Sequence, residues 1–246
     1  LLFVLYAYIQ GYDPTLFWPF FVRWMHVLCG VMWIGLLWYF NFVSTPTTPS
    51  IPQELRPALG KYITPAEMWW FRWAAVITVL MGLAYWGNIV TADAHNAHAS
   101  VGMAMGSFFL IWTVVWGLLY VLLIPGKGAL NNGWALAPLV AIIVIAAAWL
   151  FLNLNDHGWE SNRLLAIGIG GGLGWVMLLN VWGVIWRIQK RIIQWTKKNA
   201  EDGTPVPEKA SRMARMSFLC SRIKAFLSLP LLFFMAAASH YPMFGK

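Results

Sequence analysis

The side chains in this sequence that are best suited to bind a metal are its five histidines. They are His26, His95, His98, His157 and His240. Neutral imidazole is a standard axial ligand of haem iron, so histidines in apolar surroundings indicate a haem or metal site. His26 is the clearest candidate, because it lies inside an apolar run, where an ionisable residue marks a functional site by default. Gly30 follows one helical turn later and leaves room for a flat macrocycle.

Two further histidines are candidates for a second ligand of the same iron. His98 precedes Gly102 and Gly106 at i+4 and i+8, which repeats the pattern at His26, and His240 ends the last apolar run. The sequence therefore predicts a b-type haem bound by His26 together with His98 or His240. The alternative is that His26 forms a hydrogen bond between helices and that its glycines serve close packing.

Other polar or glycine-rich segments are compatible with more than one kind of site. Arg23, one turn before the first histidine, could pair with a haem propionate or extend to the membrane surface. Segment 93–98 holds one Asp and two His, which could bind zinc or copper or simply cap the next helix. Segment 168–174 has overlapping G-x-x-x-G pairs, which indicate tight helix packing. No C-x-x-C-H motif occurs around Cys29 or Cys220, so the chain builds no covalently attached c-type haem.

Membrane-spanning helices are the elements that must position these side chains. Of the 246 residues, 60% are hydrophobic and 11% are charged, against roughly 25% charged in a soluble domain, so the apolar surplus must face lipid. In hydrocarbon every backbone N–H and C=O needs an internal partner, which favours helices for such continuous runs. The predicted spans are about 17–43, 66–90, 98–124, 134–153, 163–187 and 218–240.

The predicted fold is therefore an all-α integral membrane protein with about six transmembrane helices. Residues 1–16 are expected to form an outer N-terminal segment, and residues 17–246 a single helical bundle. The last span has a short apolar part, so Arg222 and Lys224 are expected to extend to the membrane surface at its inner end.

The loops between these spans differ in charge. Lys and Arg gather in the Pro/Thr-rich connector 45–65, in the loop of Lys127 and in the long segment 187–217, whereas 91–97 and 154–162 contain none. The positive-inside rule places the basic loops in the cytoplasm and both termini, with all five histidines, on the outer side. The net charge of +8 is thus assigned to orientation and to anionic membrane lipids, and no nucleic-acid partner is expected.

Three stretches resemble the membrane domain of bacterial urate hydroxylases of the PuuD type, also known as the urate oxidase N-terminal domain. Arg23-Trp24-x-His26-Val27, followed by Gly35 and Tyr39-Phe40, resembles the first span of that domain. The pattern in 180–190, Asn-Val-Trp-x2-Ile-Trp-x2-Gln-Lys, resembles the end of its penultimate span. Segment 229–242, which closes with Ser-His-Tyr-Pro, resembles its last span and is the most specific of the three.

This resemblance implies a membrane domain followed by an outward-facing c-type cytochrome domain, in the bacterial inner membrane. It also implies urate oxidation, with electrons passed to the respiratory chain. Because the sequence has no c-type haem motif, the cytochrome partner is expected on a separate chain. The resemblance further implies a histidine about five residues after Arg163, where this chain has Gly168, and this departure weakens the expectation of urate chemistry.

Three functions follow as hypotheses. The first is a membrane redox subunit that binds haem b near the outer face and works with a c-type cytochrome or a larger respiratory or photosynthetic complex. The second is a non-catalytic accessory subunit of such a complex, and the third is a urate-oxidising membrane enzyme.

Overall fold

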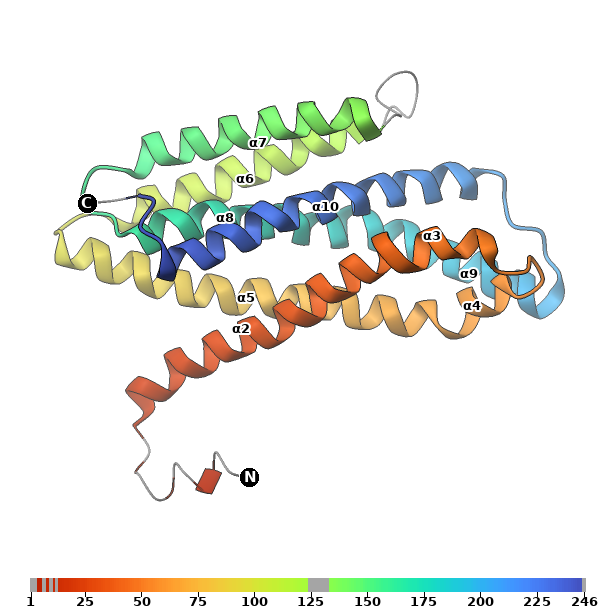
Figure 1. The fold of residues 1–246 in the computed structure, drawn as a ribbon, viewed down its shortest axis with the longest axis horizontal. Helices are drawn as coiled ribbons and strands as arrows, with labels where there is room; N and C mark the ends of the chain where they lie inside the picture. Colours follow the sequence, from red (N-terminus) through yellow and green to blue (C-terminus); the bar gives the residue numbers. More distant parts are fainter. Residues whose placement is uncertain (1–3, 6–7, 9–10, 12, 124–132, 245–246) are drawn as a thin grey trace.

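The computed structural model describes residues 4–5, 8, 11, 13–123 and 133–244. Six long helices run side by side through the molecule (Figure 1). They are α2 (Pro14–Trp38), α5 (Thr64–Asn96), α6 (Val101–Leu123), α7 (Gly133–Asn155), α8 (Asn162–Asn180) and α10 (Lys209–His240). Each is long and apolar enough to cross a membrane, and the described residues contain no strand. The prediction of an all-α membrane protein with six spans is confirmed.

Shorter helical elements extend two of these helices. The end of α2 continues as a π-helical segment, η1 (Tyr39–Ser44), and then as the short turns α3 (Thr45–Thr47) and η2 (Thr48–Ser50). The end of α8 continues as a second π-helical segment, η4 (Val181–Ile185), and then as α9 (Trp186–Asp202). The Pro/Thr-rich connector is therefore more helical than expected, because its prolines lie at the first positions of short helices, where no N–H partner is needed.

Helix α2 begins at a defined cap. The carboxylate of Asp13 accepts hydrogen bonds from the Oγ1 (2.6 Å) and the backbone N–H (2.8 Å) of Thr15, and these bonds lower the pKa of Asp13. The predicted outer segment 1–16 thus ends within the first turn of α2, and most of its remaining residues lie outside the described part of the chain.

Helix α8 lies at the centre of the bundle because its glycines let large side chains approach its backbone. The Phe151 ring of α7 and the Trp112 indole of α6 fill the spaces beside Gly168 and Gly172, where any Cβ would overlap them. The indole N–H of Trp112 donates to the Gly168 carbonyl at 3.1 Å. The prediction that segment 168–174 serves tight helix packing is confirmed.

The two ends of the bundle differ in charge as expected. The basic helix α9 packs beside α4 (Arg56–Tyr62) at one end, with Lys61 Nζ 3.6 Å from Glu201 Oε1. The α5–α6 and α7–α8 connections and the end of α10 lie at the opposite end (Figure 1). The two described basic segments therefore share an end, called the inner end below, and the loop of Lys127 lies outside the described residues. Assignment of the inner end to the cytoplasm stays a prediction.

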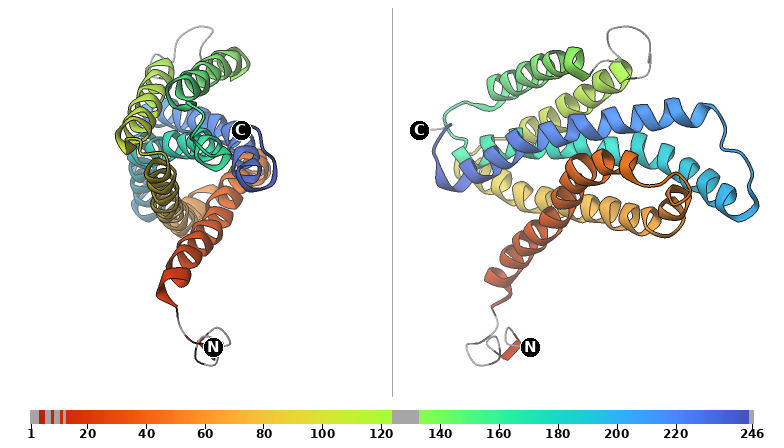
Figure 2. Two further views of the ribbon diagram at one scale, coloured as in Figure 1. Left: turned by 90° about the vertical axis from the view of Figure 1, so that its left-hand side faces the viewer. Right: turned by 45° about the vertical axis from the view of Figure 1, so that its right-hand side comes forward.

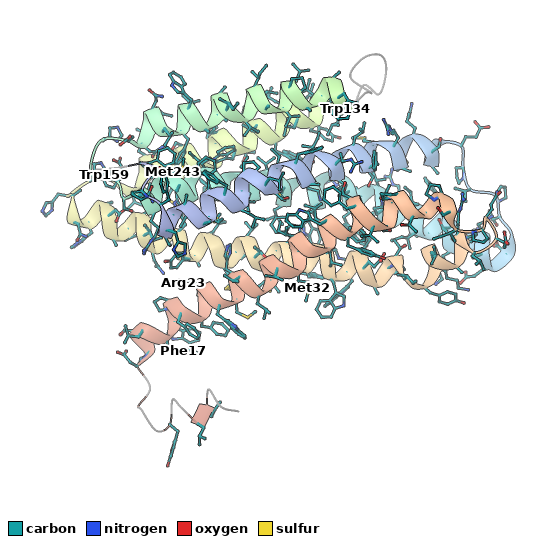
Figure 3. All side chains as sticks on the ribbon, viewed as in Figure 1. Phe17, Arg23, Met32, Trp134, Trp159 and Met243 are labelled. Carbon is teal, nitrogen blue, oxygen red and sulfur yellow. The ribbon has the colours of Figure 1, made fainter. Side chains whose placement is uncertain are left out.

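The first half of α2 diverges from the other helices (Figure 2). It packs on α5, whereas Trp18, Phe20 and Trp24 are about half exposed. Phe17 and Arg23 mark this diverging part in Figure 3. Exposed aromatic residues of this kind are suited to lipid contact.

Candidate functional site

His26 belongs to α2, and its side chain is held against α5 by two contacts. Its Nδ1 lies 2.7 Å from the carbonyl oxygen of Thr78, so Nδ1 carries the proton in the neutral ring and donates to that oxygen. The ring rests on Gly82, where a Cβ would approach Cε1 to 2.8 Å. Metal-bound histidines are commonly oriented by such a bond, which leaves Nε2 unprotonated and free to ligate. The same contacts are also those of a histidine that joins two helices.

The structure does not bring the predicted second ligands to His26. His26 is level with Thr78 and Gly82 of α5, whereas His98 follows the end of that helix at Asn96, fourteen residues or about 21 Å beyond Gly82. His98 is also not helical, since it has a positive φ of 54° in the α5–α6 connection. The expected alignment of His98 with Gly102 and Gly106 on one helix is therefore wrong.

His240 is likewise remote from His26. The side-chain amide of Asn162 binds the carbonyls of Ala237, Ala238 and Tyr241, so the end of α10 lies beside the start of α8. The start of α8 is level with Trp86 of α5, because Trp86 Nε1 donates a hydrogen bond to the carbonyl oxygen of Leu164. Trp86 lies about 6 Å beyond Gly82 along α5, and Gly82 is the residue that His26 contacts. Since α2 also diverges from α10 at this end (Figures 1 and 2), the two imidazoles do not face a common iron.

The other predicted residues have ordinary structural contacts. Arg23 is exposed, and its guanidinium lies 4.8 Å from the ring centre of Tyr85. A Cβ on Gly30 would lie 3.6 Å from Thr78, which is ordinary packing between α2 and α5. Gly102 lies in the first turn of α6, where its backbone N–H donates a hydrogen bond to Ser100 Oγ. The pattern around His26 therefore reflects helix contact at these positions.

The outer histidines form no cluster with acidic or cysteine ligands. His95, His98, His157 and His240 are all exposed, and His157 Nδ1 lies 2.8 Å from Glu160 Oε1. Within the described residues no group of three or more His, Cys, Asp and Glu side chains could hold a metal ion. His95 lies in the last turn of α5 and not, as expected, in a loop.

Lys224 also lies elsewhere than its sequence context predicts. Its side chain does not extend to the surface but is fully enclosed in the bundle, with 0% exposure. Its Nζ has no hydrogen-bond partner and lies 4.5 Å from the ring centre of Phe71. A desolvated cation–π contact contributes about 2 kcal/mol, whereas burying a charge costs several kcal/mol, so this contact alone does not account for the lysine.

A cavity of about 640 Å³ with both polar and aromatic side chains in its wall lies at the inner end of the bundle. Its wall includes Phe71, the ring under which Lys224 lies, together with Phe40 and Phe218. The hydrogen-bonding and charged residues of the wall come from η1, α3, η2, α5, α9 and α10. They are Ser44, Thr45, Thr48, Thr64, Glu67, Gln189, Arg215, Ser217 and Ser221. Here this cavity is called the inner pocket.

Both π-helical segments contribute to the inner pocket, η1 through Phe40 and Ser44 and η4 through Ile185. Such segments interrupt the regular i→i−4 ladder and are frequent at functional sites. Asn41 within η1 and Asn180 directly before η4 are buried amides, and each has one unpartnered atom, Oδ1 and Nδ2 respectively. Unsatisfied buried polar atoms are rare in proteins, so each of these two atoms calls for a local explanation.

A sequence signal for this region existed in the last helix. Ser217, Ser221, Lys224 and Ser228 recur at spacings of three and four, which places them on one face of α10. That face is directed toward the interior of the bundle, because Ser217, Lys224 and Ser228 are buried. Ser228 Oγ also accepts a hydrogen bond from Trp38 Nε1 at 2.9 Å. A polar stripe on a membrane helix predicts an inward face, and this spacing could have located Lys224.

The fold and the inner pocket together define a multi-pass helical membrane protein with a cavity at one end that is lined by aromatic and hydrogen-bonding side chains. Comparison with protein families gives a more specific result. A family model described as urate oxidase N-terminal matches residues 56–246, the part from α4 to the end of the chain. The chain belongs to this family. No curated protein and no solved structure matched it.

Proposed function

We propose that this chain is the membrane-embedded subunit of a urate-oxidising redox system, in which the inner pocket binds a flat organic anion of the urate class. The observation that carries the proposal is a cavity of about 640 Å³ with aromatic and hydrogen-bonding side chains in its wall, one of which, Phe71, covers the enclosed and unpartnered Lys224. Membership of the urate oxidase N-terminal family supports the choice of urate among such anions.

The wall of the inner pocket suits the chemistry of a purine anion. Phe40, Phe71 and Phe218 offer apolar surfaces for the faces of a flat ring. Gln189, whose Nε2 donates to Ser217 Oγ at 3.0 Å, offers an amide for the ring edge, where carbonyl and N–H groups alternate. Lys224 adds positive charge below Phe71. These residues would bind and orient the ring, and no electron-transfer step is assigned to them.

Urate binding to the purified full chain in lipid nanodiscs tests this function directly. Isothermal titration calorimetry is expected to give one site, and Gln189→Ala to weaken it by about tenfold, since a lost hydrogen bond leaves a buried polar edge unpaired. The matched control is Gln194→Ala on the same helix, since Gln194 is exposed and does not line the pocket. Absence of urate binding to the wild-type chain would favour the accessory-subunit hypothesis.

Haem b on His26 is a second candidate, favoured by the Nδ1 hydrogen bond to Thr78. The described residues fit this group only in part, because no second histidine lies level with His26, so a bis-histidine haem is not proposed. A pyridine haemochrome assay on the purified chain tests for haem. If haem is present, His26→Ala is expected to abolish or shift the Soret band, whereas His157→Ala, at an exposed outer position, is expected to leave it unchanged.

The partner in this proposal is a c-type cytochrome, in the bacterial inner membrane. The resemblance to the urate hydroxylase family supports it. Crosslinking in native membranes, followed by detection of covalent haem in the crosslinked band, is expected to identify such a partner. Recovery of the chain without any redox protein would contradict this part of the proposal.

A further inference from the structure

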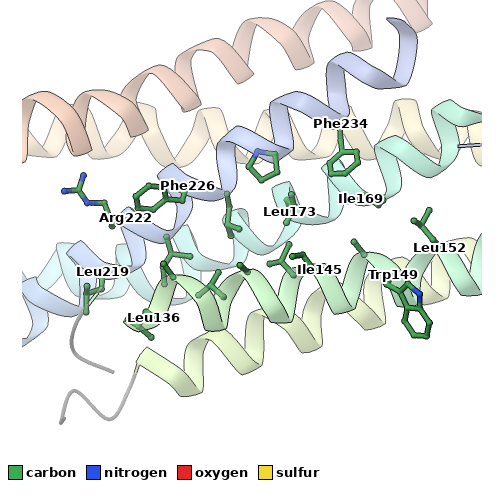
Figure 4. A pocket seen from close by; sticks show the side chains of 18 of the residues that line it. Leu136, Ile145, Trp149, Leu152, Ile169, Leu173, Leu219, Arg222, Phe226 and Phe234 are labelled. Carbon is green, nitrogen blue, oxygen red and sulfur yellow. The ribbon is translucent and has the colours of Figure 1, made fainter. Parts of the chain in front are cut away.

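A long apolar groove separates α7 from α10 (Figure 4). Ile169 and Leu173 of α8 line its floor, and Ile145 of α7 and Phe226 of α10 lie on its rims, each more than half exposed. The groove has a volume of about 590 Å³ and extends along α7 from Leu136 to Leu152. An exposed apolar groove on a membrane helix bundle is open to lipid.

One charged residue, Arg222, is among the described residues that line this groove, and it lies toward the inner end (Figure 4). Its Nη1 donates to the carbonyl of Asn41 in η1 at 3.3 Å, so one of the five N–H groups of the guanidinium is engaged at the inner end of α10. Arg222 precedes His240, the last residue of α10, by eighteen residues or about 27 Å, close to the thickness of the hydrocarbon layer. With His240 at the outer surface, Arg222 is therefore at the depth of the inner headgroups.

The width of the groove distinguishes between possible occupants. Leu136 and Leu152 are sixteen residues or about 24 Å apart along α7, so a volume of about 590 Å³ describes a groove that is several times longer than it is wide. A helix is about 10 Å across and would not enter such a space. A single hydrocarbon chain, with carbon contacts of about 4 Å on each side, would fill it.

We propose that the groove binds one acyl chain of an anionic phospholipid from the inner leaflet, with its phosphate at Arg222. Phosphate and guanidinium form charge-assisted hydrogen bonds, which favour an anionic headgroup that lacks its own cation. The apolar wall between Leu136 and Leu152 would bury the chain along the same axis as the surrounding bilayer. This site is separate from the inner pocket and does not depend on urate binding.

Spin-label spectroscopy on the reconstituted full chain tests the proposal with two probes, spin-labelled phosphatidylglycerol and phosphatidylcholine. The wild-type chain is expected to immobilise phosphatidylglycerol preferentially, and Arg222→Gln to reduce that preference by roughly fivefold. Ala141→Trp, which places an indole in the groove, is expected to lower the immobilised fraction of both probes. Ala146→Trp is the matched control, since Ala146 is an exposed residue of α7 that does not line the groove.

Two results would overturn this assignment. An unchanged preference in Arg222→Gln would remove the headgroup site, and equal effects of Ala141→Trp and Ala146→Trp would show that the chain does not occupy the groove. Thermal unfolding of each variant in detergent separates these outcomes from misfolding. A photocrosslinking amino acid placed at position 141 tests for a protein neighbour. A crosslink from it to another protein in native membranes would identify the groove as a subunit interface and would reject the lipid site.

Discussion

Lys224 has no counterion and no hydrogen bond among the described residues, although it is enclosed on all sides. Removing one member of a buried charge pair costs several kcal/mol, because it leaves the other charge unpaired. A charged amine that is buried without any partner carries the same free-energy cost in the native protein. Folding alone would favour an apolar side chain here. A binding role explains the lysine, because an anion in the neighbouring inner pocket would supply the charge that the protein lacks.

Lys224→Met is therefore expected to stabilise the protein and impair its function. Methionine has a similar length and no charge, so we expect the free energy of unfolding to rise by about 1–4 kcal/mol. Urate affinity is expected to fall about tenfold, because the positive charge behind Phe71, a residue of the pocket wall, is lost. Thermal unfolding and calorimetry on the same preparation measure the two effects.

The control for this change is Lys190→Met, at an exposed lysine of α9. It removes the same charge at the same end of the molecule, and both quantities should stay close to those of the wild-type chain. Loss of stability in Lys224→Met with urate affinity intact would assign the lysine to the fold and not to binding.

At the scale of single elements, α8 shows how glycines determine packing. Gly172 lies under the Trp112 indole, and Trp112 is itself fully buried. By contrast, nothing lies within 4 Å of the place where a Cβ on Gly106 of α6 would be. Two glycines of similar helical context thus differ in whether a neighbour occupies the space beside them.

Gly172→Ala and Gly106→Ala are expected to have opposite effects. Gly172→Ala forces a methyl group into the rigid indole, and overpacking of this kind destabilises by about 1–3 kcal/mol. Gly106→Ala meets no neighbour and should stabilise α6 by about 0.5–1 kcal/mol through helix propensity. Midpoints of thermal unfolding in one detergent measure both. Equal shifts in the two variants would show that the Trp112 contact does not constrain α8.

Hydropathy predicted the helices well because an apolar run in lipid has few alternatives to a helix. Hydropathy does not predict which side of a helix faces the bundle, and for this reason it places Lys224 at the surface. Pattern also failed at His98, where a chain reversal after Asn96 interrupts the expected helix. The level at which His26 meets α5 depends on the tilt of α2, which no local residue pattern specifies.

For the whole molecule, charge asymmetry between the two ends predicts orientation. Lys198 of α9 and Tyr241 after α10 are both exposed, and they lie at opposite ends of the bundle. In intact cells, an impermeant thiol reagent is expected to label Tyr241→Cys from outside and Lys198→Cys only after permeabilisation. The native cysteines, Cys29 and Cys220, are buried and provide a low background.

The reverse labelling pattern would place the inner pocket on the outer side. In that case the positive-inside assignment would be wrong. Labelling of both positions from outside would contradict the number of spans, since Lys198 and Tyr241 are separated by one long helix.

The contact between Phe151 and Gly168 also limits which substitutions position 168 can accept during evolution. The family resemblance implies a histidine at position 168, yet the buried Phe151 ring occupies the space into which any side chain there would extend. A histidine cannot return by one substitution, because position 151 must first become small, and that intermediate carries a cavity. Relatives should therefore show the two positions varying as a pair, with histidine at one only where the other has lost its ring.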